Sequence, residues 1–312
     1  MFKFIIAKWD SCMKTAYAST WDDFCIESWR KLVEYANNKG ILLTFYINAG
    51  YVESGKFNTI PTNSKMSIKD IQFFKQIIQK GNEIGGHTMN HIDMSTMSNE
   101  DIEKDCIEWI NLMKYNNLIQ KNQGLTFSYP FGKKPKSLDI IKKYFIGARS
   151  ITTGLNNFDP KNIYRLKSIN LGKRTKLEKL NKLIEESIEN EQILIESGHG
   201  VSEEGVKEGW SPIPLDIICK HYDYISKKKE IWKTTIANIV KYIEQRNHIE
   251  LIHYNNVITF KFNKKLEFDL IPLTIIIPKE IKSVRQNKKN ISILNNYIKT
   301  KDFINPIFYS YF

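Results

Sequence analysis

Along the chain, segments with the apolar pattern of a β-strand alternate with segments whose apolar positions have the spacing of an α-helix. Residues 41–48 read ILLTFYIN, a run of apolar, β-branched and aromatic residues that predicts a buried strand. Residues 26–38 instead place apolar side chains at helical spacing, and Gly40 follows as a stop signal. The two patterns take turns as far as residue 246, which predicts a parallel sheet covered by helices.

The predicted elements of this first part are short, and turn residues bound most of them. We predict strands over residues 2–7, 17–21, 41–48, 83–87, 125–129, 145–151, 164–169, 192–197 and 231–235, and helices over residues 26–38, 67–80, 98–115, 176–190 and 236–246. About seven repeats of the strand–helix unit predict an α/β fold, a distorted (β/α) barrel. An open doubly wound sheet is the alternative.

After residue 246 the pattern changes. Short strand-like runs cover residues 251–254, 257–262, 273–277 and 281–285, and no long helix separates them. We therefore predict a barrel over residues 1–247 and a small β-rich appendage over residues 248–312. The final stretch, from residue 291, is too weakly patterned to assign. No glycine-rich phosphate-binding motif follows a strand, so nucleotide binding has no support.

Lysine and arginine outnumber aspartate and glutamate by 46 to 34, which gives a formal net charge of +12. We interpret the excess mainly as a solvated surface, with a polyanionic partner such as a cell-wall polymer as the sharper alternative. The chain has no arginine-rich run, so we expect no nucleic-acid partner. The four cysteines show no CxxC spacing and are expected to be free thiols.

The apolar runs also bear on the compartment. None reaches the ~18 residues that a membrane helix needs, so we expect no membrane span. The first eight residues, MFKFIIAK, are too short an apolar stretch for a secretion signal. These features predict a cytoplasmic protein. The oligomeric state stays open.

The chemistry of the chain centres on two adjacent carboxylates and a histidine pair. Asp22 and Asp23 lie at the end of the predicted strand 17–21. His87 is the last residue of the predicted strand 83–87, and His91 follows four residues later. Two histidines four residues apart can face one way on a helical turn. With one carboxylate they make an N/N/O ligand set, which catalytic zinc sites often use, and the second carboxylate is then free to act as a base. The chain is therefore interpreted as a metal hydrolase.

A further histidine and an aromatic turn occupy the same level of the predicted barrel. His199 follows strand 192–197, and residues 129–132 follow strand 125–129. Catalytic groups of such barrels lie at the C-terminal ends of the strands, where all these candidates are predicted to lie.

Four segments of the chain resemble, in order, the motifs of the polysaccharide deacetylases, the NodB-like carbohydrate esterases. The segments are STWDDF, GGHTMNH, FSYPFG and ESGHG, and the corresponding family motifs are TFDDG, H[ST]xxH, RxPYG and LxH. The resemblance covers about residues 14–247. Residues 210–215 and the segment IWKTTIANIVKYIEQR resemble a bacterial subgroup that carries an extra C-terminal β-domain.

The resemblance implies roles for these residues. Zn²⁺ or another divalent ion is expected on Asp23, His87 and His91. Asp22 is expected to act as the general base and His199 as the general acid. The implied substrate-binding residues are Tyr129, Phe131 and Trp210; the backbone N–H near Phe131 helps to stabilise the oxyanion, and Trp210 closes the acyl pocket.

The chain departs from the family motifs at three positions. Phe24 replaces the glycine of the first motif, and Ser197 replaces an apolar residue that lines the acetyl pocket in the family. Ser128 stands where the family has an arginine that orients the base. Arg149 ends the next predicted strand, and we predict that its guanidinium reaches Asp22 in place of the missing one.

The leading hypothesis is a metal-dependent deacetylase that acts on the amide bond of an N-acetylated sugar polymer or oligosaccharide, with cell-wall glycan among the candidates. Hydrolysis of a non-sugar amide on the same fold is one alternative. A catalytically inactive, carbohydrate-binding relative is the other. The family is often exported, in contrast to the compartment expected from the N-terminus.

Overall fold

The computed structural model describes residues 3–50, 66–203, 206–207 and 209–311. Its centre is an eight-stranded sheet in which every neighbouring pair of strands is parallel. The strands are β2 (Thr15–Asp23), β3 (Leu43–Ile47), β4 (Glu83–Gly86), β5 (Thr126–Ser128), β6 (Gly147–Arg149), β7 (Ile169–Asn170), β8 (Leu194–Gly198) and β12 (Ile231–Lys233). They run in the order β6-β5-β4-β3-β2-β8-β7, and β12 pairs with β2.

The two edges of this sheet are joined by residues 163–168. Ala148 N donates to Ile163 O at 2.9 Å, and Ser150 N donates to Leu166 O at 2.8 Å, so this segment lies along β6 before it enters β7. The sheet therefore curls into a distorted barrel, as predicted, and the alternative of an open doubly wound sheet is wrong. The sequence placed a full strand over residues 164–169, but regular pairing begins only at Ile169.

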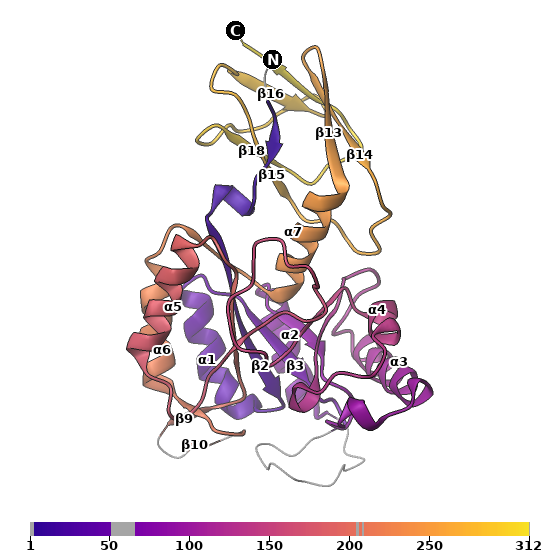
Figure 1. Ribbon diagram of the computed structural model, residues 1–312, viewed down its shortest axis with the longest axis vertical. Helices are drawn as coiled ribbons and strands as arrows, with labels where there is room; N and C mark the ends of the chain where they lie inside the picture. The colour runs from indigo at the N-terminus through magenta and orange to yellow at the C-terminus, as the bar shows by residue number, and fades with distance from the viewer. Residues whose placement is uncertain (1–2, 51–65, 204–205, 208, 312) are drawn as a thin grey trace.

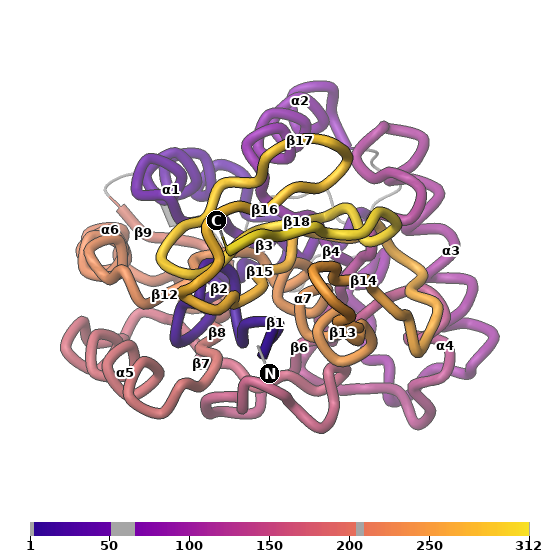
Figure 2. Tube along the Cα trace, turned by 90° about the horizontal axis from the view of Figure 1, so that it is seen from above, coloured from indigo at the N-terminus to yellow at the C-terminus, as the bar shows by residue number. Residues whose placement is uncertain are grey.

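Within the described residues, six helices flank the barrel. Figure 2, seen from above, shows them around the sheet. They are α1 (Ile26–Asn38), α2 (Ile68–Gln79), α3 (Asn99–Tyr115), α4 (Asp139–Tyr144), α5 (Leu177–Glu189) and α6 (Leu215–Ser226). Their apolar faces pack on the outside of the sheet, around Trp29, Phe45 and Trp109. Helices α4 and α6 have no counterpart in the predicted elements.

Helix α7 (Ile236–His248) closes the barrel at the N-terminal end of the strands. Its first backbone N–H groups have no partner within the helix and instead donate to barrel side chains. Ile236 N donates to Thr44 Oγ1 at 3.1 Å, and Ala237 N donates to the Glu83 carboxylate at 2.9 Å. The opposite end of the barrel stays open for the site.

Two antiparallel sheets follow α7 and form the upper part of the molecule in Figure 1. The three-stranded sheet contains β1 (Ile5–Ile6), β15 (Leu273–Ile276) and β18 (Tyr297–Thr300), and the five-stranded sheet contains β13 (Ile249–Tyr254), β14 (Val257–Phe262), β19 (Ile307–Ser310), β16 (Ser283–Gln286) and β17 (Lys289–Asn290). Apolar side chains from both sheets pack into a common core, among them Ile258, Ile275 and Ile298.

The predicted opening strand, residues 2–7, belongs to this part of the molecule. Ile5 and Ile6 pair with Ile276 and Ile275 of β15, and not with a strand of the barrel. The sequence could not reveal this because the partner lies about 270 residues further along the chain. The division of the chain at residue 247 stays a prediction.

The remaining elements are short. They are β9 (Val201–Glu203), β10 (Val206–Lys207) and β11 (Ile213–Pro214), and the 3₁₀ turns η1 (Asp10–Cys12), η2 (Met94–Thr96) and η3 (Pro130–Gly132). All four cysteines are free thiols, as expected. Among the described residues, no helix is long and apolar enough to cross a bilayer.

Candidate active site

The C-terminal ends of the strands surround a pocket of about 240 Å³. Every predicted site residue except Asp23 lines it: Asp22, His87, His91, Tyr129, Phe131, Arg149, His199 and Trp210. All of them except Trp210 come from the ends of five barrel strands or from the loops just after them, and Trp210 precedes the short strand β11. The fold thus brings together side chains that lie as much as 188 residues apart, as expected for a barrel of this kind.

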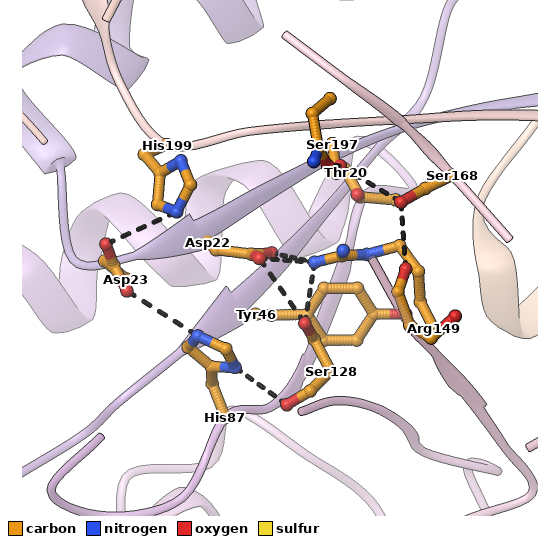
Figure 3. A network of polar contacts seen from close by, with 12 residues as sticks. Thr20, Asp22, Asp23, Tyr46, His87, Ser128, Arg149, Ser168, Ser197 and His199 are labelled. Carbon is orange, nitrogen blue, oxygen red and sulfur yellow. Dashed lines mark hydrogen bonds and ion pairs between the residues drawn. The ribbon is translucent and has the colours of Figure 1, made fainter. Parts of the chain in front are cut away.

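Asp22 and Asp23 end β2 and point to different partners because successive side chains of a strand alternate in direction. Figure 3 shows Asp22 directed at Arg149 and Asp23 directed at the histidines. Asp23 also has a left-handed backbone, with φ of 77°. The strand geometry therefore separates the two carboxylates, in the sense that the family resemblance implies for Asp23 and Asp22.

Asp23, His87 and His91 form a three-residue cluster with one ligand atom each within 4.8 Å of one another. Asp23 Oδ1 lies 3.6 Å from His87 Nε2 and 3.3 Å from His91 Nε2. It is buried and has no hydrogen-bond partner among the described residues. Such an atom between two imidazoles fits a divalent cation, and the N/N/O donor set suits zinc.

The tautomer of His87 agrees with this interpretation. Its Nδ1 lies 2.7 Å from the backbone carbonyl oxygen of Ser128, which can only accept a hydrogen bond. In the neutral ring the proton therefore sits on Nδ1, and the lone pair of Nε2 faces Asp23. Ligating histidines are commonly held in this way through the other ring nitrogen.

The loop that carries the two histidines is irregular. The sequence suggested a helical turn, but residues 87–93 have no regular structure. Thr88 and His91 have φ of 60° and 51°. The helical-turn expectation is therefore wrong, and the convergence of His87 and His91 depends on the surroundings of the loop.

Arg149 contacts Asp22, as the sequence predicted. The Nη2 group of Arg149 donates to both carboxylate oxygens of Asp22 and, at 2.6 Å, to Ser128 Oγ. Arg149 is completely buried, and Asp22 is 6% exposed. Burial would raise the pKa of Asp22, but the charge of Arg149, together with His87, His199 and the hydrogen bond from Arg149, lowers that pKa below its ordinary value. Asp22 is thus a carboxylate at neutral pH.

His199 follows β8 on the far side of Asp23 from His87. Its Nε2 lies 4.0 Å from Asp23 Oδ2, and its backbone carbonyl accepts a hydrogen bond from Trp29 Nε1 at 2.6 Å. Its Nδ1 is buried and has no hydrogen-bond partner within the described part of the chain. The backbone of His199 is therefore anchored, whereas no described side chain fixes the tautomer of its ring.

Aromatic residues form the rim of the pocket. Phe131 and Trp210 are each about half exposed, at 49% and 50%. The Phe131 ring lies edge-on to His91 at 4.4 Å between centroids, and Trp210 lies edge-on to His199 at 5.5 Å. Tyr129 is buried beneath them and donates its hydroxyl proton to Tyr164 O at 3.0 Å. The rim can therefore cover a ligand that reaches the cluster of Asp23, His87 and His91.

Residues 12–146 match the family model described as polysaccharide deacetylase. The chain is similar in fold to a putative polysaccharide deacetylase from Mycobacterium smegmatis, at a TM-score of 0.54 and 9% identity over 78% of this chain and 94% of that one. A probable polysaccharide deacetylase from Pseudomonas aeruginosa also has a TM-score of 0.54, at 10% identity over 78% and 95% of the two chains. The family model thus covers the part of the chain that contains the first three resembling motifs, and the two solved structures share its fold.

A curated relative is a gellan lyase from a Bacillus species, 26% identical over 227 residues. The match covers 65% of this chain but only 9% of the gellan lyase, so the chain spans less than a tenth of that protein's length. The similarity therefore concerns one segment of a much longer protein.

Of the three departures from the motifs of the polysaccharide deacetylases, Ser128 is the one that the structure accounts for best. Ser128 and Arg149 are direct partners across the parallel pair β5–β6, so they lie at the same level of the barrel and on the same face. The small serine leaves room for the guanidinium from the next strand and accepts one of its hydrogen bonds. The positive charge beside Asp22 is thus retained, one strand further along.

The departure at Ser197 makes one wall of the pocket polar. Ser197 Oγ donates to Asn170 Oδ1 at 2.8 Å and lies 3.1 Å from Ser168 Oγ. Asn170 lines the pocket as well. Neither Asn170 nor Ser168 was among the predicted site residues, because their strand was misplaced in the sequence by several residues.

Phe24, which replaces the glycine of the first motif, is buried and packs edge-on against Phe74 of α2 at 5.7 Å between ring centroids. The substitution therefore serves the packing between β2 and α2.

The three histidines without a predicted role lie elsewhere: His221 is buried against Glu196 at 2.9 Å, and His248 and His253 lie near the C-terminal sheets.

Proposed function

We propose that this chain is a metal-dependent hydrolase that removes N-acetyl groups from an N-acetylated sugar polymer or oligosaccharide. The observation that carries the proposal is the separation of the two carboxylates. Asp23 faces two imidazole nitrogens, and Asp22 faces a buried arginine in the same pocket. One carboxylate can therefore serve a cation while the other stays available as a base.

Asp23, His87 and His91 would hold a divalent ion, most suitably Zn²⁺. A bound ion of this kind lowers the pKa of its water toward about 7 and polarises the carbonyl group of the substrate. The protein contributes the fixed direction of the three donors, since His87 is held through Nδ1 and Asp23 is held at the end of β2.

Asp22 is the proposed general base. It lines the pocket, and Arg149 keeps it charged, so it can accept a proton from the attacking water. His199, on the other side of Asp23, is the proposed general acid. An amide needs such an acid because the amine is a poor leaving group until its nitrogen is protonated.

The substrate would lie against the aromatic rim. Phe131 exposes ring surface beside His91, a proposed metal ligand, and Trp210 exposes ring surface beside His199, the proposed acid. Tyr129 forms the wall beneath them. The backbone N–H of Phe131 is the proposed donor to the oxyanion of the tetrahedral intermediate. A glycan is favoured over a non-sugar amide by the family alone, which leaves the identity of the glycan to experiment.

A catalytically inactive, carbohydrate-binding protein is the second candidate. The observation in its favour is His199 Nδ1, which is buried without a described partner, because catalytic histidines usually have that nitrogen oriented by another group. This candidate predicts metal and glycan binding without release of acetate.

The test is acetate release from a panel of N-acetylated glycans, with gellan added because of the similarity to a gellan lyase. It is run on the parent protein, Asp22→Asn and His87→Ala, with the metal content of each measured. We expect Asp22→Asn to retain metal and lose at least about 100-fold in turnover, the size of a general-base contribution. We expect His87→Ala to lose the metal and the activity together.

The matched control is His248→Ala, a histidine at the end of α7 that lies outside the pocket. It should behave as the parent does. Acetate release by Asp22→Asn at the parent rate would rule out the proposed base. Metal binding by the parent without acetate release from any glycan would favour the inactive, carbohydrate-binding protein.

A further inference from the structure

Helix α3 carries a buried carboxylate that the proposed mechanism does not use. Asp105 is 7% exposed and lies on the apolar face of α3 with Ile102, Cys106 and Trp109. Aspartate is almost never buried unless it is paired. Here the one hydrogen-bond donor to it, among the described residues, is the backbone N–H of Met89, at 3.1 Å and 3.0 Å from the two carboxylate oxygens.

Met89 is the central residue of the metal-ligand loop, two residues from His87 and two from His91. Its other backbone group is held as well, because Gly50 N donates to Met89 O at 2.7 Å. A side chain at position 50 would interfere with this contact, since a Cβ there would lie 2.7 Å from Met89 O and 2.3 Å from Asn90 Oδ1. The peptide groups on both sides of Met89 are thus tied to neighbouring elements.

These ties matter because the loop backbone is unfavourable by itself. Thr88 and His91, with positive φ, adopt a region that residues with a side chain seldom occupy. Such conformations persist only where the surroundings hold them. Within the loop, the Thr88 hydroxyl accepts from Ile92 N at 3.2 Å. The hydrogen bond that Met89 N donates to the Asp105 carboxylate ties the loop to helix α3.

Burial raises the pKa of Asp105 to about 6, and the nearby Glu108 adds to the effect. At neutral pH this carboxylate is therefore charged at a cost that an apolar side chain would avoid. A position that served only to pack α3 would favour an apolar residue. The charge-assisted hydrogen bond to Met89 is the interaction that offsets the cost.

We propose that Asp105 is a positioning residue for the metal site, which acts by fixing the backbone of Met89 so that the rings of His87 and His91 converge on Asp23. The inference rests on the metal site of the proposed function. It assigns to α3 a part in metal binding that none of the ligand motifs contains.

The experiment compares the dissociation constants of Zn²⁺ and Co²⁺ for the parent, Asp105→Ala and Asp105→Asn by competition with a chromophoric chelator. Loss of a group that orients a ligand typically weakens metal binding by about 10–100-fold, which we expect for Asp105→Ala. The amide oxygen of Asp105→Asn can still accept from Met89 N, but without charge, so its loss should be smaller. The visible absorption of bound Co²⁺ should change in the same order.

Glu108→Gln is the matched control, because it removes a carboxylate from the exposed face of the same helix. It should bind both ions as the parent does. An affinity of Asp105→Ala within twofold of the parent, with an unchanged Co²⁺ spectrum, would overturn the inference and leave Asp105 a structural residue.

Two further outcomes separate this inference from the proposed function. If the parent binds neither ion, the metal site itself fails, and the role of Asp105 fails with it. If circular dichroism shows that Asp105→Ala does not fold, Asp105→Asn decides. Parent-like affinity of that variant would overturn the inference, and a folded variant with reduced affinity would support it.

Discussion

At the scale of single residues, the pairing of Asp22 with Arg149 is the contact on which the proposed chemistry depends most. A buried aspartate without a cation would have a raised pKa and would be protonated over more of the pH range. Arg149 opposes this effect, because its guanidinium is buried with Asp22 and contacts both carboxylate oxygens. Its charge is the largest of the effects that lower the pKa of Asp22.

Replacement of Arg149 by serine tests this dependence. The pKa of Asp22 should rise, since the largest effect that opposes burial would be lost, and the base would then become protonated at a higher pH. We expect the acid limb of the kcat/KM profile to move to higher pH by about one to three units, with a lower plateau. The pH–rate profile of acetate release measures both effects.

The exchange of the two residues, Ser128→Arg with Arg149→Ser, is the matched rescue. Because the two positions are partners across β5 and β6, the guanidinium would return to the same level from the other strand. The double variant should recover part of the activity that Arg149→Ser loses. An acid limb that does not move in Arg149→Ser would refute the assigned role of Arg149.

The sequence allowed the cluster of Asp23, His87 and His91 and the contact of Arg149 with Asp22 to be predicted, but not the place of Asp105. The residues of this cluster have a recognisable spacing. Arg149 ends the strand that follows Ser128, the position where the family has an arginine. Asp105 has no motif, because its partner is a backbone N–H group. One signal was present: a carboxylate among the apolar positions Ile102, Cys106 and Trp109 of a predicted helix.

At the scale of elements, local signals decided which predictions succeeded. Helix α1 has the predicted bounds, and Gly40 adopts the expected left-handed backbone just beyond it, with φ of 70°. Helix α2 begins after Ser67, which forms a capping box with Asp70. Helices with such start and stop signals can be located from the sequence because the signals are neighbours of the helix itself.

Short strands lacked signals of this kind. The segment 163–168 has strand-like residues, yet it only bridges β6 and β7, because its place is set by closure of the barrel. Strand β1 is similarly assigned by a partner at the other end of the chain. Strands β18 and β19 lie in the stretch that was left unassigned. The position of these elements is decided by long-range contacts, which the local sequence pattern does not reveal.

At the scale of the whole molecule, the C-terminal sheets cover the end of the barrel opposite the site. In Figure 1, β2 and β3 run away from these sheets, and α7 connects the two parts. Leu273 of β15 and Phe303 belong to the same apolar cluster as Trp9 and Val240. The sheets therefore share a core with the closed end of the barrel and help to seal it.

This shared core leads to a stability prediction. Leu273→Ala should lower the free energy of unfolding by about 2–5 kcal/mol, because Leu273 is 1% exposed and its removal leaves a cavity. Leu294→Ala, at a position that is 52% exposed, is the matched control and should have little effect. Denaturant unfolding followed by tryptophan fluorescence measures both. Equal midpoints for the two variants would show that the barrel does not depend on this contact.

The central claim is that a bound divalent ion and Asp22 together hydrolyse an N-acetyl group. Its most direct test is the rate of acetate release from N-acetylated glycan by the parent protein, before chelation, after removal of the metal and after return of Zn²⁺. We expect release to cease in the stripped protein and to return with about one equivalent of Zn²⁺, since one N/N/O site is present in the described residues. Undiminished release by fully stripped protein would contradict the account.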